Sequence, residues 1–323
     1  MHKESTSNVQ PTPLTSIGTV TNKLRSALTT FLCAREVLPE HISAVVWSAL
    51  DVLEDTELAC TTALEKFKSD CMEGEQYLLI YGCLQVLFAQ QDAARHLRGV
   101  FGLDDELPVK LKVLREVRNS GVGHPAKRGK GNTAKSNFII RSSMRHGCFT
   151  LMTEGFGDEL YSQDIDLSDQ INVQIKELES WLREIHLKLC DRERSHRERF
   201  RESRLSSIFP SSLDYYARRL STVSDRSQVR GTELAEISVI REALAKLKKA
   251  VAERGIVQWE GSDFQLHANL VEHCLARLHQ GISLDRDELT DLDISAYGHC
   301  LVLTIGKLQR TCEDVDSIYD EEP

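Results

Sequence analysis

Apolar residues recur at helical spacing along most of this 323-residue chain, with few interruptions by glycine or proline. Three long segments of this kind lie between residues 16 and 101, and a fourth follows them and ends at Gly121 and Gly123. A helix with an apolar stripe has to bury that stripe against other elements. We therefore expect a mainly α fold, preceded by a flexible polar tail at residues 1–16.

The pattern changes after the fourth segment. Two runs rich in β-forming residues flank the turn Arg145-His146-Gly147, which predicts a β-hairpin at about residues 137–153. A long helical pattern then begins near Ser168 and extends to about Ser203. Residues 17–204 are therefore expected to form one helical domain that carries the hairpin.

A second helical region is expected at the C-terminal end of the chain. The joint between Arg204 and Pro210 contains serines and a proline, which makes it the best candidate for a domain boundary. Amphipathic segments follow near residues 211–224, 229–254, 263–280 and 288–313. These segments predict a smaller helical region at residues 205–323.

The segment Asp191–Arg204 holds six arginines in fourteen residues, which is suggestive of nucleic-acid binding. Four carboxylates are interleaved with these arginines, so most of the charge is matched at helical spacing. We therefore favour a solvated helical face over a nucleic-acid site for this segment.

Composition restricts the function classes further. With 41% hydrophobic residues, the chain is not a disordered polymer, a collagen or a small disulfide scaffold. Its formal charge of -9 opposes binding of nucleic acid or anionic membrane by the molecule as a whole, so any anion has to meet a local patch. The nine cysteines form no C-x-x-C pair, and no long apolar run occurs. We expect a cytoplasmic protein with reduced thiols and no membrane partner.

Residues 117–153, here called the acid-free window, contain no aspartate or glutamate. The window carries seven lysines and arginines, whereas the rest of the chain carries 33 of them against 49 carboxylates. A gap of this length in an acidic chain favours a site that meets an anion such as a phosphate. The alternative, which charge alone leaves equally open, is an exposed basic loop without a ligand.

The most specific chemistry lies at the start of this window, where the fourth helix ends. Arg118 is a permanent cation that can grip a phosphate through two parallel hydrogen bonds, and Asn119 adds a neutral donor and acceptor. His124 is the side chain best suited to move a proton near neutral pH. If the glycines turn the backbone back, these residues can address one phosphodiester. That set suffices for metal-independent RNA cleavage, in which the ribose 2′-OH attacks its own phosphate.

Arg118, Asn119 and His124 resemble the R-x(4–6)-H motif of HEPN domains, in which an arginine, a favoured polar residue and a histidine lie at the end of a helix. The resemblance implies a helical bundle that dimerises, so that two motifs face each other in a composite cleft. It also implies an endoribonuclease of toxin, abortive-infection or antiviral systems, with an antitoxin or regulatory protein as a further partner. The flanking helices extend the likeness to residues 16–203, although the motif itself defines three positions.

The expected roles follow from this combination. Arg118, Asn119 and His124 are the candidate catalytic residues, and Lys127, Arg128 and Lys130 are expected to bind the RNA backbone, with no metal and no cofactor. The alternative is a noncatalytic helical module that binds a nucleotide, RNA or a protein partner through the basic loop. A second Arg-to-His spacing, Arg141 to His146, lies on the hairpin and is interpreted as a chance match.

Overall fold

The computed structural model describes residues 16–31, 38, 40–123, 128–129, 134–155, 160–222, 230–256, 263–283 and 290–321. These residues form two compact units. The first unit comprises the described residues of 16–29 and 38–189, and the second comprises those of 30–31 and 190–321. The mainly α fold expected from the sequence is confirmed.

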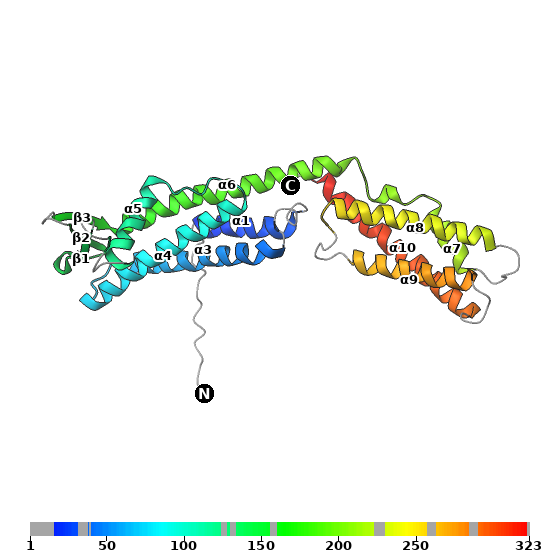
Figure 1. The fold of residues 1–323 in the computed structure, drawn as a ribbon, viewed down its shortest axis with the longest axis horizontal. Helices are drawn as coiled ribbons and strands as arrows, with labels where there is room; N and C mark the ends of the chain where they lie inside the picture. The colour runs from blue at the N-terminus through cyan, green and yellow to red at the C-terminus, as the bar shows by residue number, and fades with distance from the viewer. Residues whose placement is uncertain are drawn as a thin grey trace, which may run out of the picture. The chain divides into compact units, whose positions relative to one another are not determined.

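The first unit is built on long helices that run side by side (Figure 1). They are α1 (Ser16–Thr30), α3 (Glu40–Lys66), α4 (Glu73–Val100), the shorter α5 (Val109–Arg118) and the first two thirds of α6 (Leu167–Arg201). The apolar stripe of each helix is buried; on α1 it includes Ile17, Val20 and Leu24. The helical segments expected between residues 16 and 101 and the fourth one after them are therefore confirmed.

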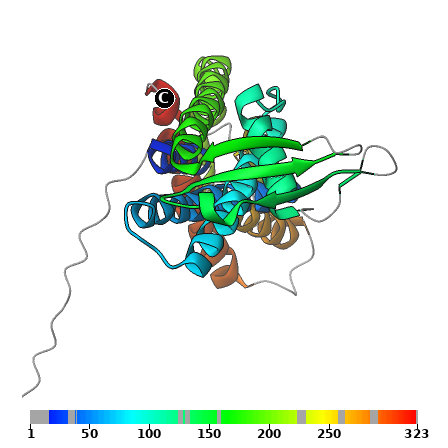
Figure 2. The same ribbon diagram turned by 90° about the vertical axis from the view of Figure 1, so that its left-hand side faces the viewer.

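An antiparallel sheet covers one end of these helices, as Figure 2 shows. Its strands β1 (Ser136–Ile139), β2 (Cys148–Glu154) and β3 (Leu160–Asp166) lie in chain order. Ile139 pairs with Leu151, and Phe149 pairs with Ile165. These four side chains are buried in the same apolar cluster as Leu114. The expected hairpin is confirmed, but the sheet gains a third strand that the sequence did not predict.

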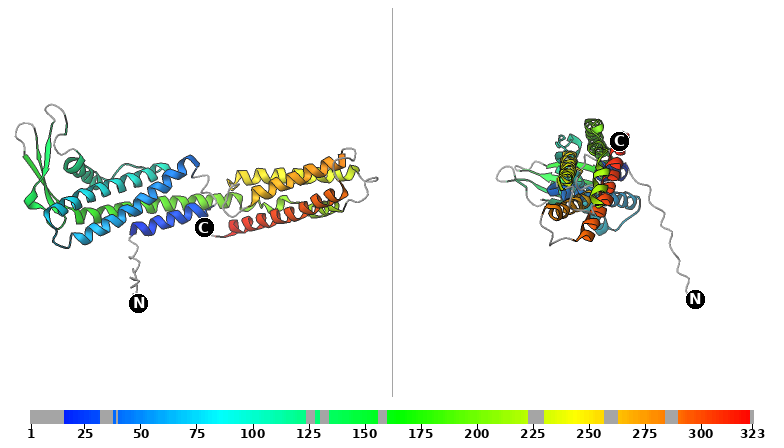
Figure 3. Two further views of the ribbon diagram at one scale, coloured as in Figure 1. Left: turned by 90° about the horizontal axis from the view of Figure 1, so that it is seen from below. Right: turned by 90° about the vertical axis from the view of Figure 1, so that its right-hand side faces the viewer.

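The second unit consists of α7 (Leu213–Ser221), α8 (Arg230–Glu253), α9 (Phe264–Ser283), α10 (Asp291–Asp320) and the last turns of α6. Figure 3 shows α8, α9 and α10 side by side. Helices α7 and α10 approach so closely that a Cβ at Gly298 would lie 2.4 Å from Ser221 Cα. The helical segments expected after Pro210 are therefore present.

The division between the units lies inside α6, at Leu189 and Cys190, and not at the expected joint near Leu205. The physical reason is that the last turns of α6 bind the end of α10. Arg197 donates hydrogen bonds to the carbonyl oxygens of Ile318 and Glu321, both at 2.9 Å.

The expectation of a solvated helix for Asp191–Arg204 is wrong for one face of the segment. Glu193, His196, Arg197 and Phe200 are buried at successive turns of α6, while the residues between them are exposed. Arg197 Nε lies 2.7 Å from Glu193 Oε1, and His196 Nε2 lies 3.1 Å from the Tyr319 hydroxyl. Because charged residues dominate this segment, its sequence did not reveal the buried helical stripe that these residues form.

None of the helices in the described part of the chain combines the length and the apolar character that crossing a membrane requires. The eight cysteines that the structure describes are free thiols, and burial raises the pKa of Cys60 and Cys312 to about 12. The buried thiols of Cys60 and Cys312 pack as small apolar side chains.

Candidate functional site

The end of α5 places the first two candidate catalytic residues side by side. Arg118 is the last residue of α5, and Asn119–Gly123 continue the chain as a single π-helical turn. We expected Gly121 and Gly123 to break the helix; instead the helix widens there. A wider turn of this kind brings the residue five positions on back over the first one. A Cβ at Gly123 would lie 3.0 Å from Arg118 Nη1, so a glycine leaves room for the guanidinium.

The guanidinium of Arg118 is held by neutral groups. Its Nε and Nη2 donate to Gln85 Oε1 at 3.1 and 2.8 Å, and its Nη1 donates to Asn119 Oδ1 at 3.1 Å. It also stacks over Phe88, with 4.3 Å between Cζ and the ring centroid. Among the described residues, no carboxylate forms an ion pair with Arg118. Its position is therefore fixed, and its positive charge is not matched by any carboxylate that the structure describes.

Two neighbouring arginines are matched by carboxylates. Arg115 Nη1 lies 2.7 Å from Asp92 Oδ1, and Arg128 Nη1 lies 2.6 Å from Glu116 Oε2. The hydrogen bond from Arg128 holds the pKa of Glu116 below its usual range. Arg118 therefore differs from both neighbours in its availability to an external anion.

Buried glutamines beneath the site connect three helices. Gln174 of α6 accepts a hydrogen bond of 2.7 Å from Gln91 of α4 and donates one of 2.8 Å to Gln90. All three side chains are fully buried. Gln91 also reaches the backbone oxygen of Leu111 in α5. Because buried amides need partners in a fixed geometry, this network sets how α4 and α5 lie against α6, and hence where Arg118 sits.

The candidate RNA-binding residues are only partly described. Arg128 lies beside the π-helical turn, where its Nη1 is 3.2 Å from Ser120 Oγ, and its backbone pairs with Lys135. Its charge is matched by Glu116, which lies one residue outside the acid-free window. His124, Lys127 and Lys130 lie outside the described residues. The structure therefore brings Arg118 and Asn119 together and places Arg128 at the same turn.

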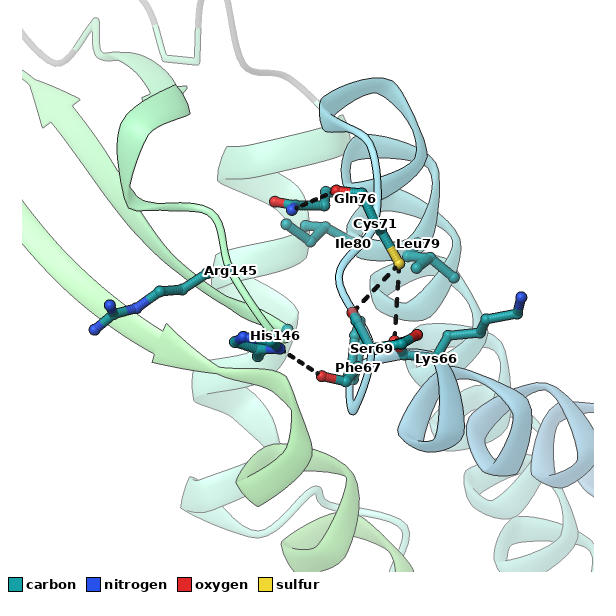
Figure 4. Close-up of a pocket in the computed structure, with 10 residues that line it drawn as sticks. Lys66, Phe67, Ser69, Cys71, Gln76, Leu79, Ile80, Arg145 and His146 are labelled. Atoms are coloured by element: carbon teal, nitrogen blue, oxygen red, sulfur yellow. Dashed lines mark hydrogen bonds between the residues drawn. The ribbon is translucent and has the colours of Figure 1, made fainter.

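The second Arg-to-His spacing lies beside a separate, small pocket between the hairpin and the end of α3. Figure 4 shows His146 directed toward the Phe67 carbonyl oxygen and Arg145 pointing away from Cys71. His146 Nδ1 lies 3.1 Å from that oxygen, so this nitrogen carries a proton. His146 has a φ of 52°, and Gly147 has no space for a Cβ because of Phe67. Arg141 is paired with Glu73 at 2.6 Å.

Metal binding has no support in the described part of the chain, where no group of three or more His, Cys, Asp or Glu side chains is arranged to hold an ion. On α9, Cys274 lies in the apolar core of the second unit, where burial raises its pKa to about 12.

The residues that sequence reasoning missed are Gln85, Phe88 and Gln91, all on α4. They act on Arg118 and Arg115 from positions more than twenty residues earlier in the chain. The one available signal was the Gln90-Gln91 pair inside the apolar pattern of α4, at positions where a core helix normally carries apolar side chains.

Comparison of the chain with models of protein families, with curated proteins and with solved structures found no match.

Proposed function

We propose that this protein is a metal-independent endoribonuclease whose reaction is centred on Arg118. The observation that carries the proposal is the state of that side chain. It is oriented by Gln85, Phe88 and Asn119, and no described carboxylate neutralises it. A fixed cation with an unmatched charge is suited to a phosphate, because binding then requires neither reorientation nor loss of an ion pair.

His124 supplies the acid–base chemistry in this proposal. It directly follows Gly123, whose position next to Arg118 Nη1 shows that the π-helical turn returns the chain to the guanidinium. The role of His124 itself rests on the sequence. It removes the proton from the ribose 2′-OH or protonates the leaving 5′-oxygen, and Asn119 orients one of the two partners.

The reaction is an attack of the ribose 2′-oxygen on the adjacent phosphorus. The P–O5′ bond breaks, the 2′-OH proton passes to the base, and the 5′-oxygen leaves as a hydroxyl after protonation. Arg118 stabilises the negative charge that builds up on the non-bridging oxygens. The products carry a 2′,3′-cyclic phosphate and a 5′-hydroxyl. DNA lacks the 2′-nucleophile and is not cleaved.

Further elements of the proposal rest on the resemblance to HEPN domains. They are a homodimer with a composite cleft, RNA steering by Lys127, Arg128 and Lys130, and a place in a toxin, abortive-infection or antiviral system with a regulatory partner. Within this set, Arg128 is the residue whose charge the fold already matches, through Glu116. We therefore assign it a smaller share of the RNA affinity than the two lysines.

The test is incubation of the purified full-length protein with total RNA in the presence of EDTA, followed by analysis of the RNA ends. We expect cuts that resist chelation and leave cyclic phosphates. These cuts should be lost in Arg118→Ala and His124→Ala. A matched control is Arg194→Ala, because Arg194 is an exposed arginine on α6 that pairs with Asp191.

Two outcomes would contradict the nuclease. Cleavage abolished by EDTA would exclude the metal-independent mechanism. Intact RNA that is nevertheless bound, with binding lost in Arg118→Ala, would instead support the noncatalytic alternative, in which the same guanidinium holds RNA without cutting it.

A further inference from the structure

Tyr81 and the glycine that follows it, Gly82, lie on the exposed part of α4, about one turn before Gln85, which binds Arg118; Tyr77 is partly buried beside Tyr81. Tyr77 and Tyr81 pack edge to face, with ring centroids 5.8 Å apart, and Tyr81 is 39% exposed. Leu78, one turn before Tyr81, is 76% exposed. The fold therefore leaves an aromatic ring and a large apolar side chain in solvent at one place on this helix, which we call the α4 platform (Leu78, Tyr81 and Gly82).

Gly82 has no structural explanation within the described chain. It lies in the middle of a 28-residue helix, and a Cβ built there would meet no described atom within 4 Å. A glycine inside a helix costs about 1 kcal/mol of stability relative to alanine. Close approach of another molecule to the helix backbone is a physical reason for a glycine at such a position. Gly82 follows Tyr81 in the chain and lies one helical turn after Leu78, which neighbours both positions on the helix surface.

The α4 platform is aligned with Arg118. Tyr81 and Gln85 are four residues apart, so they share one face of α4 and are separated by about 6 Å along its axis. Gln85 is the residue that accepts two hydrogen bonds from Arg118. The guanidinium therefore contacts α4 between one and two helical turns beyond Tyr81, at Gln85 and Phe88, a span on the scale of a nucleotide.

A second cation, Arg141, lies near the start of α4. Arg141 pairs with Glu73 and hydrogen-bonds to Tyr77, two interactions that raise its pKa. Because Glu73 already neutralises Arg141, Arg118 is the cation beside α4 that no described carboxylate matches. A single nucleic-acid strand that runs along this face of α4 would therefore place a phosphate at Arg118 and a base at Tyr81.

We propose that the α4 platform is a base-stacking subsite, which takes an unpaired nucleobase next to the phosphate held by Arg118. The base packs on Tyr81, over the open backbone of Gly82 and against Leu78. The ligand is single-stranded RNA, since a base inside a duplex does not expose its face. This inference rests on the proposed function, because it assumes that Arg118 holds an RNA phosphate.

The test measures binding of a fluorescently labelled 12-nucleotide single-stranded RNA to the full-length protein by anisotropy. His124→Ala serves as the parent so that the RNA stays intact. We expect Tyr81→Ala to weaken binding about 5- to 100-fold, the range that loss of one stacked base produces, and Tyr81→Phe to bind within about 2-fold of the parent. The same RNA annealed to its complement should bind less tightly than the single strand.

Two matched controls separate stacking from folding. Gly74 lies on α4, is exposed and likewise has no described atom within 4 Å of a built Cβ. Gly82→Gln and Gly74→Gln should both raise the melting temperature, but Gly82→Gln alone should weaken RNA binding. Tyr215 of the second unit is 56% exposed and packs edge to face on Tyr216, so Tyr215→Ala should leave binding unchanged.

The outcomes distinguish this inference from the function on which it rests. Unchanged binding in both Tyr81→Ala and Gly82→Gln, with binding still lost in Arg118→Ala, would overturn the platform and leave the proposed function standing. No RNA binding by the parent would overturn both. Equal affinity for duplex and single strand would overturn the platform.

Discussion

The arginines of Asp191–Arg204 in the second unit and Arg118 in the first unit use the same side chain for opposite purposes. Arg197 is buried, pairs with Glu193 and donates to carbonyl oxygens at the end of α10, while Arg204 pairs with Asp320. Arg118 is oriented by amide oxygens and an aromatic ring. The density of arginines in a sequence is therefore a poor guide to anion binding. An arginine is available to an external anion only when the fold does not pair it with a carboxylate.

The polar side chains that the two units bury also differ in charge. Besides the charged residues Glu57 and Arg98, the first unit buries the three neutral amides Gln90, Gln91 and Gln174, whereas the second buries the ion pair of Glu193 and Arg197. Buried amides cost less to desolvate than ions. A buried ion pair holds only as long as both partners are present.

The largest effect on stability is expected from Arg197→Ala. It removes the arginine that forms an ion pair of 2.7 Å with the fully buried Glu193, which should lower the free energy of unfolding by about 3–5 kcal/mol in urea denaturation. The double variant Glu193→Leu with Arg197→Met should recover most of this loss, and Arg194→Ala should change stability by less than about 1 kcal/mol. A loss below about 1 kcal/mol for Arg197→Ala would remove the contrast between the units.

The next effect concerns activity. Arg118→Ala should lower the RNA cleavage rate about 10²- to 10³-fold, as removal of one transition-state donor does, with little change in melting temperature. Arg118→Lys should restore only a small part, because an ammonium cannot reproduce the two parallel hydrogen bonds of the guanidinium. Cleavage assays and thermal unfolding on the same samples check this. A variant that unfolds like Arg197→Ala would show that Arg118 is structural.

A smaller effect is expected from Gln174→Leu in the first unit. It leaves Gln90 and Gln91 without their buried partner, which should cost about 1–3 kcal/mol in urea denaturation and lower cleavage through the shifted position of α5. Gln163→Leu on the exposed strand β3 is the matched control. Equal stability of the two variants would argue against the glutamine network.

The smallest effect is a pH dependence in the first unit. Glu57 of α3 accepts a hydrogen bond of 2.8 Å from the backbone nitrogen of Gly18 at the start of α1, and burial raises its pKa above 4.5. Its contribution to stability is therefore fully present below about pH 4.5 and is lost as the pH rises through the raised folded-state pKa. Glu57→Gln should flatten the part of the stability profile above about pH 4.5, measured by urea denaturation as a function of pH. A profile identical to that of the parent would contradict the assignment.

The helices were predictable from the sequence because their apolar stripes are long and regular, as Ile17, Val20 and Leu24 illustrate. Strand β3 was not, because Ile165 is its one buried residue, and the five residues before it are exposed and mostly polar. The helical stripe at Glu193, His196, Arg197 and Phe200 was misjudged, since three of these four side chains are polar. The α10 partners of His196 and Arg197 also lie more than 110 residues later in the chain.

The candidate site was predictable in part. The placement of Arg118 at a helix end and the proximity of Asn119 followed from the local sequence. The π-helical turn did not, because glycines are compatible with a break as well as with a widened turn. Gln85 and Phe88 could not be found from local patterns, since their contacts with Arg118 depend on how α4 packs against α5.

The π-helical turn at Asn119–Gly123 makes the number of residues as important as their identity. A π turn holds about one residue more than an α turn, and each residue of an α-helix rotates the chain by about 100°. Loss of a single codon between Arg118 and His124 would allow an ordinary helical turn to close. Everything after it would then leave α5 in a different direction, with both of those side chains still encoded.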